Sequence, residues 1–452
     1  MKHKVKKLKL YLRNTLSADP HHKTEFEPID QKHIKMYVCG PTVYDRPHLG
    51  NARSAVVYDI LFRTLSAVYP KVTYVRNITD IDDKIINSAK QKNQKIDEIT
   101  NQYTKYYHDD IGALECLPPS HEPKATEYVD QMIQMIESLI KKGHAYVAEG
   151  HVLFAVDSFS DYGKLSNKSL DDLITGASER VEKEDYKQNQ HDFVLWKPVE
   201  ESAERGEKFD SPWGPGRPGW HIECSAMSSV LLGKTFDIHG GGADLKFPHH
   251  ENEIAQSCCA NRAANMANYW IHNGFLTVEG EKMSKSLNNF TTVRDLLDQG
   301  VEGPVIRLFY MTTHYHKPID FSKKALSDSK KAYDKFVQIL KDLPNDYESK
   351  IDEEALSYLL DDLNTPKVLA LAHQLAASSE AERLADILSL LGINFKDAQN
   401  EKDFPDDVVQ LAEMRKQARL DKDWAEADRL RGEIETAGYQ IKDIAGNNYE
   451  LS

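Results

Sequence analysis

The sequence predicts an α/β protein with a parallel-sheet domain, a connective insertion inside that domain, an α-helical bundle after it and a small C-terminal domain. Strand and helix patterns alternate at the start of the chain, polar and turn-rich stretches interrupt them near the middle, and the last third is almost wholly helical in periodicity. The chain has 452 residues, 40% of them hydrophobic, which is enough for two to four domains with sizeable cores.

The first elements predict a strand, a turn and a helix. Residues 35–39 (Lys-Met-Tyr-Val-Cys) read as a short buried strand, a Gly-Pro turn follows, and residues 52–68 have the apolar spacing of a helix. Residues 72–78 predict the next strand. This order is a βαβ unit with parallel strands, whose ligands bind beyond the carboxyl ends of the strands.

An insertion is expected to split the sheet domain. Three prolines within residues 118–123 break the first pattern, and a helical stretch, a hairpin-like β pattern over 145–157 and polar stretches follow. The segment 211–219, Ser-Pro-Trp-Gly-Pro-Gly-Arg-Pro-Gly, is rich in turn residues and marks the return to the sheet domain.

Helices are predicted for most of the remainder. After Phe321 the pattern is helical to about residue 391, with residues 344–349 as a connector, and this predicts a bundle. Residues 394–407 form a polar linker. The last block predicts one charged amphipathic helix over 408–437 before a short strand-like tail.

Composition restricts the class of protein. No uninterrupted apolar stretch has spanning length, and the basic opening, residues 1–13, lacks the long apolar run and cleavage site of a secretory signal, so a cytoplasmic location is expected. Five scattered cysteines favour thiols or metal ligands over a disulfide framework. The net charge of -14 means that any nucleic-acid partner must meet local basic faces.

Two short motifs far apart have the groups that a triphosphate needs. The first is Pro47-His-Leu-Gly-Asn51, at a predicted helix start, where backbone N–H groups and the positive end of the helix dipole favour anions. There His48 can donate to a phosphate oxygen, and Gly50 lets a nucleotide approach closely.

The second motif is Lys282-Met-Ser-Lys-Ser286. Lys282 and Lys285 flank a turn that contains Ser284, and each can swing toward a leaving pyrophosphate and offset the charge that grows in the transition state. Either motif alone is typical of an ordinary turn or basic loop. Their order and separation together predict adenylyl transfer.

A further group of residues has the chemistry of a metal site. Cys39 ends the first strand. His249 and Glu253 lie four residues apart, so that on a helix their side chains share one face. Thiolates with imidazole favour zinc over magnesium or calcium. Without a metal, such a cysteine is typically a buried small hydrophobe and such a glutamate a surface acid. The candidates are Cys39, Cys224, His249 and Glu253, with His250 and Glu251 as alternatives.

Over nearly its whole length the chain resembles class I cysteinyl-tRNA synthetases. The resemblance implies a Rossmann-type catalytic domain and ATP-dependent activation of L-cysteine to cysteinyl adenylate, with transfer to the 3′ end of tRNA(Cys) and no obligate protein partner. The motifs that carry it are Cys39-Gly-Pro-Thr-Val-Tyr-Asp45, His48-Leu-Gly50, Trp220-His-Ile-Glu-Cys224, Asp237-Ile-His-Gly-Gly-Gly242, Phe247-Pro-His-His-Glu-Asn-Glu253 and the lysine loop.

The resemblance also implies cofactors and roles. Zn²⁺ held by Cys39, Cys224, His249 and Glu253 would select the substrate thiol without an editing domain, and Mg²⁺ would accompany ATP. Trp220 and His239 resemble aromatic residues that line the cysteine pocket, and Thr79 resembles a residue near the adenylate. Asn51 is a departure, because the broader class often has a second histidine there. The residues implied to bind ATP are His48, Gly50, Asn51, Lys282, Ser284 and Lys285, of which His48, Lys282 and Lys285 are implied to be catalytic.

The implied domain order follows the same family. The boundaries are 1–20 for a basic arm and first strand, 21–122 and 206–242 for the halves of the catalytic domain, 123–205 for the connective insertion, 243–321 for a stem-contact region with the lysine loop, 322–394 for the bundle and 395–452 for an anticodon-binding domain.

Other readings stay open at this point. A related ligase joins cysteine to a small amino-sugar acceptor with the same motifs but lacks an anticodon domain, and a noncatalytic zinc- and RNA-binding relative would lose the lysines. In the last block, Arg415, Lys416 and Arg419 could line an RNA-binding side, or form a solvated face paired with Asp421 and Glu426.

Overall fold

The computed structural model describes residues 9–167, 185–200, 206–283, 289–344, 346–395, 405–444 and 448–451. The chain forms two compact units, Met1–Phe395 and Lys396–Ser452, which are described separately. Across the described ranges, no helix has the length and apolar character needed to cross a membrane. All five cysteines are free thiols.

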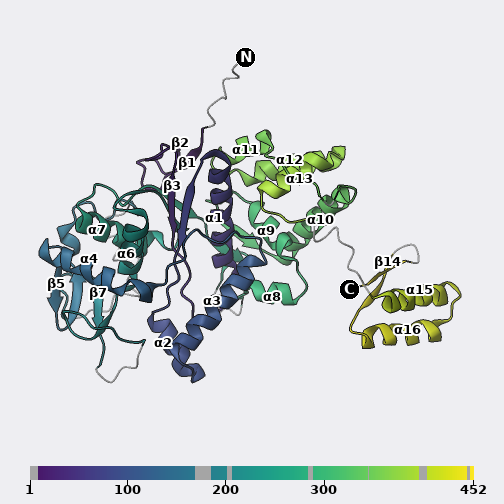
Figure 1. Ribbon diagram of the computed structural model, residues 1–452, viewed down its shortest axis with the longest axis horizontal. Helices are drawn as coiled ribbons and strands as arrows, with labels where there is room; N and C mark the ends of the chain where they lie inside the picture. Colours follow the sequence, from purple (N-terminus) through teal and green to yellow (C-terminus); the bar gives the residue numbers. More distant parts are fainter. Residues whose placement is uncertain are drawn as a thin grey trace, which may run out of the picture. The chain divides into compact units, whose positions relative to one another are not determined.

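A parallel sheet is the centre of the first unit (Figure 1). Its four strands are β3 (Ile34–Val38), β4 (Val72–Arg76), β9 (Phe236–Gly242) and β10 (Ala267–Asn273), in the order β10-β9-β3-β4. The two strands predicted near the start of the chain are therefore confirmed. Strand β10 shows that the segment after residue 242 contributes to this sheet as well.

Alternate residues of β3 enter two different cores. Met36 and Val38 pack with helix α1 (Leu49–Val68), whereas Tyr37 packs with the helices on the opposite face. Those helices are α4 (Val129–Lys141), α6 (Trp220–Leu232) and α7 (Glu251–Asn261). The sheet is thus covered on both faces, as the near-continuous apolar pattern of its strands requires.

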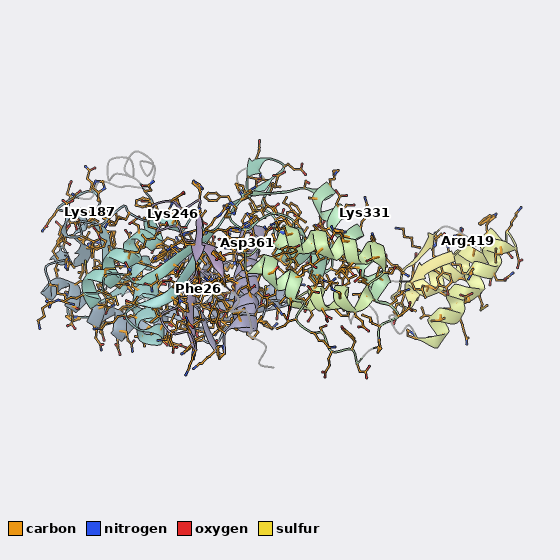
Figure 2. All side chains as sticks on the ribbon, turned by 90° about the horizontal axis from the view of Figure 1, so that it is seen from above. Phe26, Lys187, Lys246, Lys331, Asp361 and Arg419 are labelled. Atoms are coloured by element: carbon orange, nitrogen blue, oxygen red, sulfur yellow. The ribbon has the colours of Figure 1, made fainter. Side chains whose placement is uncertain are left out.

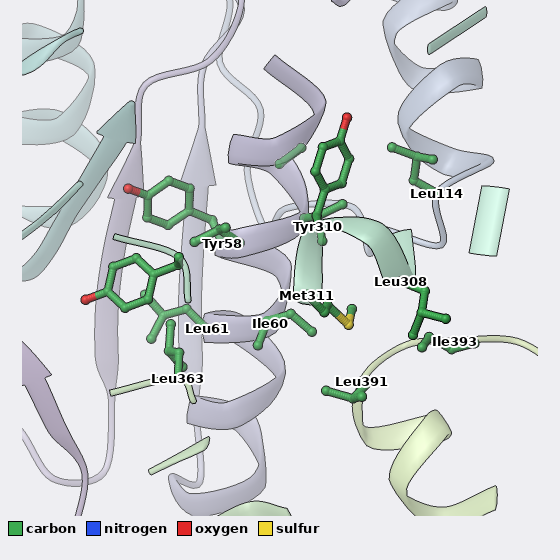
Figure 3. Packing of buried hydrophobic residues seen from close by; sticks show 14 of the residues in the cluster. Tyr58, Ile60, Leu61, Leu114, Leu308, Tyr310, Met311, Leu363, Leu391 and Ile393 are labelled. Carbon is green, nitrogen blue, oxygen red and sulfur yellow. The ribbon is translucent and has the colours of Figure 1, made fainter. Parts of the chain in front are cut away.

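Helix α1 joins the sheet to the rest of the unit. Figure 3 shows Ile60 of α1 beside Met311 of α9 (Gly303–Met311), whereas the Tyr58 ring points from α1 toward the strands. The Tyr58 hydroxyl donates to a backbone oxygen of the sheet and accepts the Gly241 N–H at 2.6 Å. A Cβ on Gly240 would lie 2.3 Å from the Tyr58 ring, so the Gly240–Gly242 run is a packed strand and not a turn.

The insertion is an antiparallel sheet in the order β5-β6-β7-β8. Its hairpin, β5 (Ala145–Ala148) and β6 (His151–Phe154), was predicted, and β7 (Phe193–Pro198) and β8 (Gly216–Pro218) complete it. Helices α2 (Asp83–Lys92) and α3 (Ile96–Gly112) precede the insertion.

The remaining elements of the first unit include the predicted helical bundle. They are β1 (Tyr11–Arg13), β2 (Lys23–Glu25), β11 (Leu276–Val278), β12 (Glu281–Lys282), α8 (Val293–Asp298), β13 (Ile319–Phe321), α10 (Lys323–Leu340), α11 (Glu353–Leu359), α12 (Thr365–Ser378) and α13 (Ala381–Leu390), with short helical turns at Ala125–Tyr128, Val156–Ser158 and Lys246–His250.

The second unit corrects the predicted single helix over 408–437. Two helices form, α15 (Asp406–Leu420) and α16 (Trp424–Thr436), followed by the hairpin β14 (Ile441–Ile444) and β15 (Asn448–Leu451). The break is at Lys422, whose φ of 60° is left-handed. Asp423 then caps α16 by accepting the Glu426 N–H at 3.2 Å. Charged spacing continued across the break, so periodicity alone could not locate it.

The basic residues of this unit also differ from expectation. The Arg415 side chain is only 2% exposed and donates to Asp443 at 2.7 and 3.1 Å, and Arg419 pairs with the same carboxylate. Lys416 lies 3.7 Å from Glu413. The three residues therefore pair with neither Asp421 nor Glu426. The two arginines pair with Asp443 because strand β14 brings this residue onto α15.

Strand β1 is attached to the bundle through a cluster around Asp362. Asp361, which is labelled in Figure 2, precedes Asp362 and pairs with Tyr11 in an isolated parallel bridge. Asp362 N–H donates to Tyr11 O at 2.9 Å, and the Asp362 carboxylate accepts the Arg13 N–H at 3.0 Å. His314 and His316 lie beside this carboxylate, and one ligand atom from each of the three residues lies within 4.8 Å of the others. The Arg13 guanidinium, 3.0 Å from Asp362 Oδ2, already supplies a cation there.

These two histidines should make stability depend on pH. Burial lowers the pKa of His314 to about 3 and that of His316 to about 4, and Arg13 acts in the same direction, whereas the ordinary value is 6.5. Below that value the unfolded chain binds more protons than the folded one, so the free energy of unfolding should fall as pH drops from 6.5 toward 4. Urea unfolding at several pH values should show a shallower fall for the His314→Asn/His316→Asn double variant.

The exposed His22 provides the control. A His22→Asn variant should follow the wild type across the same pH range. Equal slopes for the wild type and the double variant would contradict this role of the cluster.

Candidate functional site

Three segments bring four metal-binding side chains together beyond the carboxyl ends of the strands. Cys39 follows β3, Cys224 lies in the first turns of α6, and His249 and Glu253 lie just before and within the first turn of α7. One ligand atom from each of the four lies within 4.8 Å of the others. The predicted set is therefore a compact donor cluster.

The distances inside the cluster can be compared with those between the ligands of a tetrahedral ion. Cys39 Sγ lies 3.7 Å from Cys224 Sγ and 3.4 Å from Glu253 Oε1, and His249 Nε2 lies 3.1 Å from the same Glu253 oxygen. Zinc with bonds of about 2.3 Å to sulfur and about 2.0–2.1 Å to nitrogen or oxygen spaces its ligands about 3.3–3.8 Å apart. The two distances from Cys39 lie within this range, whereas the distance between His249 and Glu253 is shorter. The types of donor fit zinc.

The protonation states of these groups also favour a cation. Burial raises the pKa of the Cys39 and Cys224 thiols, and it lowers the pKa of His249. The imidazole is therefore neutral and has a lone pair to give. The buried thiols need a nearby positive charge to ionise, and a metal ion supplies one.

The two alternative donors have different surroundings. Glu251 accepts the N–H groups of Gly163 and Ser166 at 2.9 Å each, so its carboxylate is committed to the insertion. His250 is a member of a second, overlapping donor group with Cys39, His239 and Glu253, but its Nδ1 lies 2.8 Å from a nitrogen of His272. This second group has only one sulfur, whereas the first has two.

The residues assigned to the substrate pocket surround the cluster. His239 is fully buried, lies 2.9 Å from Glu253 Oε2 and stacks on the Trp270 ring. Trp220 is 40% exposed and stacks on His249, with ring centroids 4.2 Å apart. Thr79 is buried and donates to Glu223 at 3.0 Å. His239 and Trp220 therefore contact members of the donor cluster, and Thr79 contacts Glu223, the neighbour of Cys224 in the chain. Their roles in substrate binding stay a prediction.

Asn77 is a site residue that sequence reasoning missed. Its side-chain oxygen accepts the Gly40 N–H at 2.8 Å and lies 3.7 Å from Cys224 Sγ, so it links the turn after Cys39 to α6. The available signal was its position, since it directly follows β4 at the same sheet edge.

The histidine motif caps helix α1. His48 Nδ1 accepts the N–H groups of Gly50 at 3.0 Å and Asn51 at 3.3 Å, and the Asn51 side chain accepts the His48 N–H at 3.3 Å. Because Nδ1 is an acceptor, a neutral His48 carries its proton on Nε2, where it can donate. A Cβ on Gly50 would lie 2.8 Å from the His48 ring, so glycine is also required by this cap.

The segments on either side of the lysine loop lie against this cap. Phe290 contacts the His48 ring edge-on at 5.5 Å, and His48 and Thr292 form an antiparallel bridge. Before the loop, the Met283 methyl lies 3.9 Å from the position that a Gly50 Cβ would take. Lys282 is in β12, and Ser284 and Lys285 lie outside the described residues. The contacts of Met283, Phe290 and Thr292 bring the two ends of the loop to the histidine motif.

This fold and this pairing of motifs define a class I aminoacyl-tRNA synthetase. A family model described as the class I (C) catalytic domain of tRNA synthetases matches residues 25–331, and one described as the cysteinyl-tRNA ligase anticodon binding domain matches residues 401–449. A solved methionyl-tRNA synthetase of Mycobacterium tuberculosis, in complex with methionyl-adenylate, has the same fold, with a TM-score of 0.52 at 12% identity over 85% of this chain and 84% of that one.

Curated relatives narrow the class to one amino acid. Cysteine–tRNA ligases of Ruegeria pomeroyi and Paramagnetospirillum magneticum are 52% and 50% identical to the chain, covering 93% and 97% of it and 91% and 98% of their own lengths. That of Wolbachia pipientis from Culex pipiens is 48% identical over 96% of both chains. The chain belongs to the cysteine–tRNA ligase family.

Cobalt substitution should distinguish the two overlapping donor groups. The first group has two sulfur ligands, so a Co²⁺-loaded wild-type protein should show thiolate-to-metal absorption of two-sulfur intensity. Cys224→Ser should reduce this intensity to about half or abolish metal binding, because one of the two thiolates is lost. His250→Asn should keep the two-sulfur intensity.

The opposite pattern would select the second donor group. In that case His250→Asn would lose the metal, and Cys224→Ser would leave the spectrum unchanged.

Proposed function

We propose that the chain activates L-cysteine with ATP and transfers the cysteinyl group to the 3′ end of tRNA(Cys), in the cytoplasm and without an obligate protein partner. The observation that carries the proposal is the donor cluster with two cysteines. The capped histidine motif, which follows Cys39 in the chain, supports it. Relatives of nearly the same length with the name cysteine–tRNA ligase and the match to an anticodon-binding domain support it.

The donor cluster fits a role in selecting cysteine. Serine differs from cysteine by one heavy atom, and a pocket that discriminates by size alone gains about 1–3 kcal/mol. When bound by Cys39, Cys224, His249 and Glu253, zinc supplies a soft acceptor that prefers a substrate thiolate to a hydroxyl. His239 holds Glu253, the hardest of the four donors, in place at 2.9 Å.

The histidine and lysine motifs fit the adenylation step. The cysteine carboxylate attacks the α-phosphorus of ATP, a C–O–P bond forms, and the bond to the β-phosphate breaks as pyrophosphate leaves with its electron pair. His48 can donate from Nε2 to a phosphate oxygen, and Lys282 and Lys285 would offset the growing charge, with Mg²⁺ accompanying the nucleotide. In the second step a terminal ribose hydroxyl attacks the carbonyl carbon and AMP leaves.

Two observations weigh against the other readings. A ligase for a small amino-sugar acceptor has no use for an anticodon domain, whereas residues 401–449 match one. A noncatalytic relative would lose the lysine motif, which this chain retains at Lys282 and Lys285.

The first experiment is cysteine-dependent ATP–pyrophosphate exchange followed by charging of purified tRNA. The wild-type protein should support both. Lys285→Ala should slow exchange by about 10²- to 10³-fold, because it removes a charge that acts on the transition state, while cysteine binding is retained. Lys331→Ala, in α10, is the matched control and should leave exchange unchanged. Exchange without charging would favour the small-acceptor ligase, and absence of both would refute the proposal.

A second experiment tests thiol selection. In Cys224→Ser the cysteine-over-serine preference in exchange should fall steeply, because one ligand of the selecting site is lost. Cys258→Ser, which changes a buried thiol outside the donor cluster, should keep the preference. If a folded Cys224→Ser protein prefers cysteine as strongly as the wild type does, selection by the metal site is wrong.

A further inference from the structure

Two arginines donate hydrogen bonds to the buried carboxylate of Asp110. One comes from the segment before the histidine motif, and the other comes from the segment after the lysine loop. Asp110 lies in α3 and its side chain is fully buried. Arg46, two residues before His48, donates to it at 3.0 and 3.1 Å. Arg294, in α8, donates to it through Nε at 3.0 Å and Nη2 at 2.8 Å. Figure 1 shows α3 and α8 next to each other.

The segments that carry these arginines are also joined by their backbones. The Leu49 N–H donates to Thr291 O at 3.1 Å, and the Val293 N–H donates to Pro47 O at 3.2 Å. These bonds flank the antiparallel bridge between His48 and Thr292. The histidine motif and residues 291–293, the exit of the lysine loop, therefore form a short two-stranded ribbon. Arg46 and Arg294 flank this ribbon in the chain, and both contact the Asp110 carboxylate.

Other contacts make this clamp rigid. The Arg46 guanidinium lies over the Tyr106 ring, 3.8 Å from its centroid, and Tyr106 is also in α3. Thr292 caps α8, because its hydroxyl accepts the Asp295 N–H at 3.1 Å. The Asp295 carboxylate in turn accepts the Thr292 N–H at 2.8 Å. Charge-assisted bonds in a buried place are stronger than surface pairs.

We propose that Asp110 is a positioning residue for adenylate formation, which holds His48 and the exit of the lysine loop in register so that both motifs act on one triphosphate. This inference rests on the proposed function. Asp110 itself lies outside the donor cluster for the thiol, so its effect should be confined to the ATP side of the reaction. Removing the clamp should loosen the ribbon without disturbing Cys39, Cys224, His249 or Glu253.

The test is steady-state pyrophosphate exchange by the full-length protein with Asp110→Asn and Arg294→Gln. Asp110→Asn should raise the KM for ATP and lower kcat, with a combined loss of about 10- to 100-fold, because small misplacements of reacting groups cost rate at this scale. The KM for cysteine and the zinc content should stay within about twofold of the wild type. Asp110→Glu, which keeps the charge, should recover part of the loss.

Arg294→Gln tests the same link if Asp110→Asn does not fold, since Arg46 still compensates the buried charge. It should give the same separation between ATP and cysteine. The Asp110→Asn/Arg294→Gln double variant should lose little more than Asp110→Asn alone, because both changes break one clamp.

Asp352 provides a matched control in the bundle. Its buried carboxylate accepts the Ala355 N–H at 2.9 Å and pairs with Arg383 at 2.9 Å. Asp352→Asn should lower thermal stability and leave both KM values unchanged. The inference is wrong if Asp110→Asn and Arg294→Gln leave the ATP parameters at the level of Asp352→Asn, or if they change the cysteine KM equally. A wild-type protein without exchange would instead refute the proposed function.

Discussion

The site depends on the contacts that one buried carboxylate, that of Glu253, makes with its neighbours. It contacts Cys39 at 3.4 Å, His249 at 3.1 Å and His239 at 2.9 Å. The two histidines are buried as well, and Cys39 is partly buried. Burying an ionised carboxylate is costly unless a cation or hydrogen bonds compensate it, and the two thiols beside it ionise only when a cation is present. The arrangement is therefore understandable as a metal site and difficult to explain as ordinary packing.

The sheet is what allows these groups to meet. Parallel strands end at one edge, so Cys39 after β3 and Asn77 after β4 are neighbours, although 38 residues separate them. Helices α6 and α7 begin near the same edge and add Cys224 and Glu253. The histidine motif starts α1 from the turn that also carries Cys39. In the proposed function, one sheet edge therefore serves both thiol selection and phosphate binding.

The residues proposed for thiol selection and those proposed for phosphate binding are kept in place by different kinds of contact. The thiol side is a dense, buried cluster in which each donor supports another. The phosphate side is a ribbon between His48 and Thr292, with a loop whose ends lie against it and a clamp at Asp110 behind it. This separation explains why changes at Asp110 and at Cys224 are expected to affect different substrates.

Much of this protein was determined by the sequence itself. The first two strands of the sheet, helix α1, the insertion hairpin and the bundle follow from local apolar periodicity. The chemistry of thiols, imidazole and carboxylate identified the candidate donors, and the resemblance to the family selected four of them. Tertiary structure decided what depends on distant partners: the break at Lys422, the pairing of Arg415 with Asp443, the commitment of Glu251 to the insertion, and the Asp110 clamp. A charged residue has the same local pattern whether it faces water, RNA or a buried partner, so only the fold reveals which one it meets.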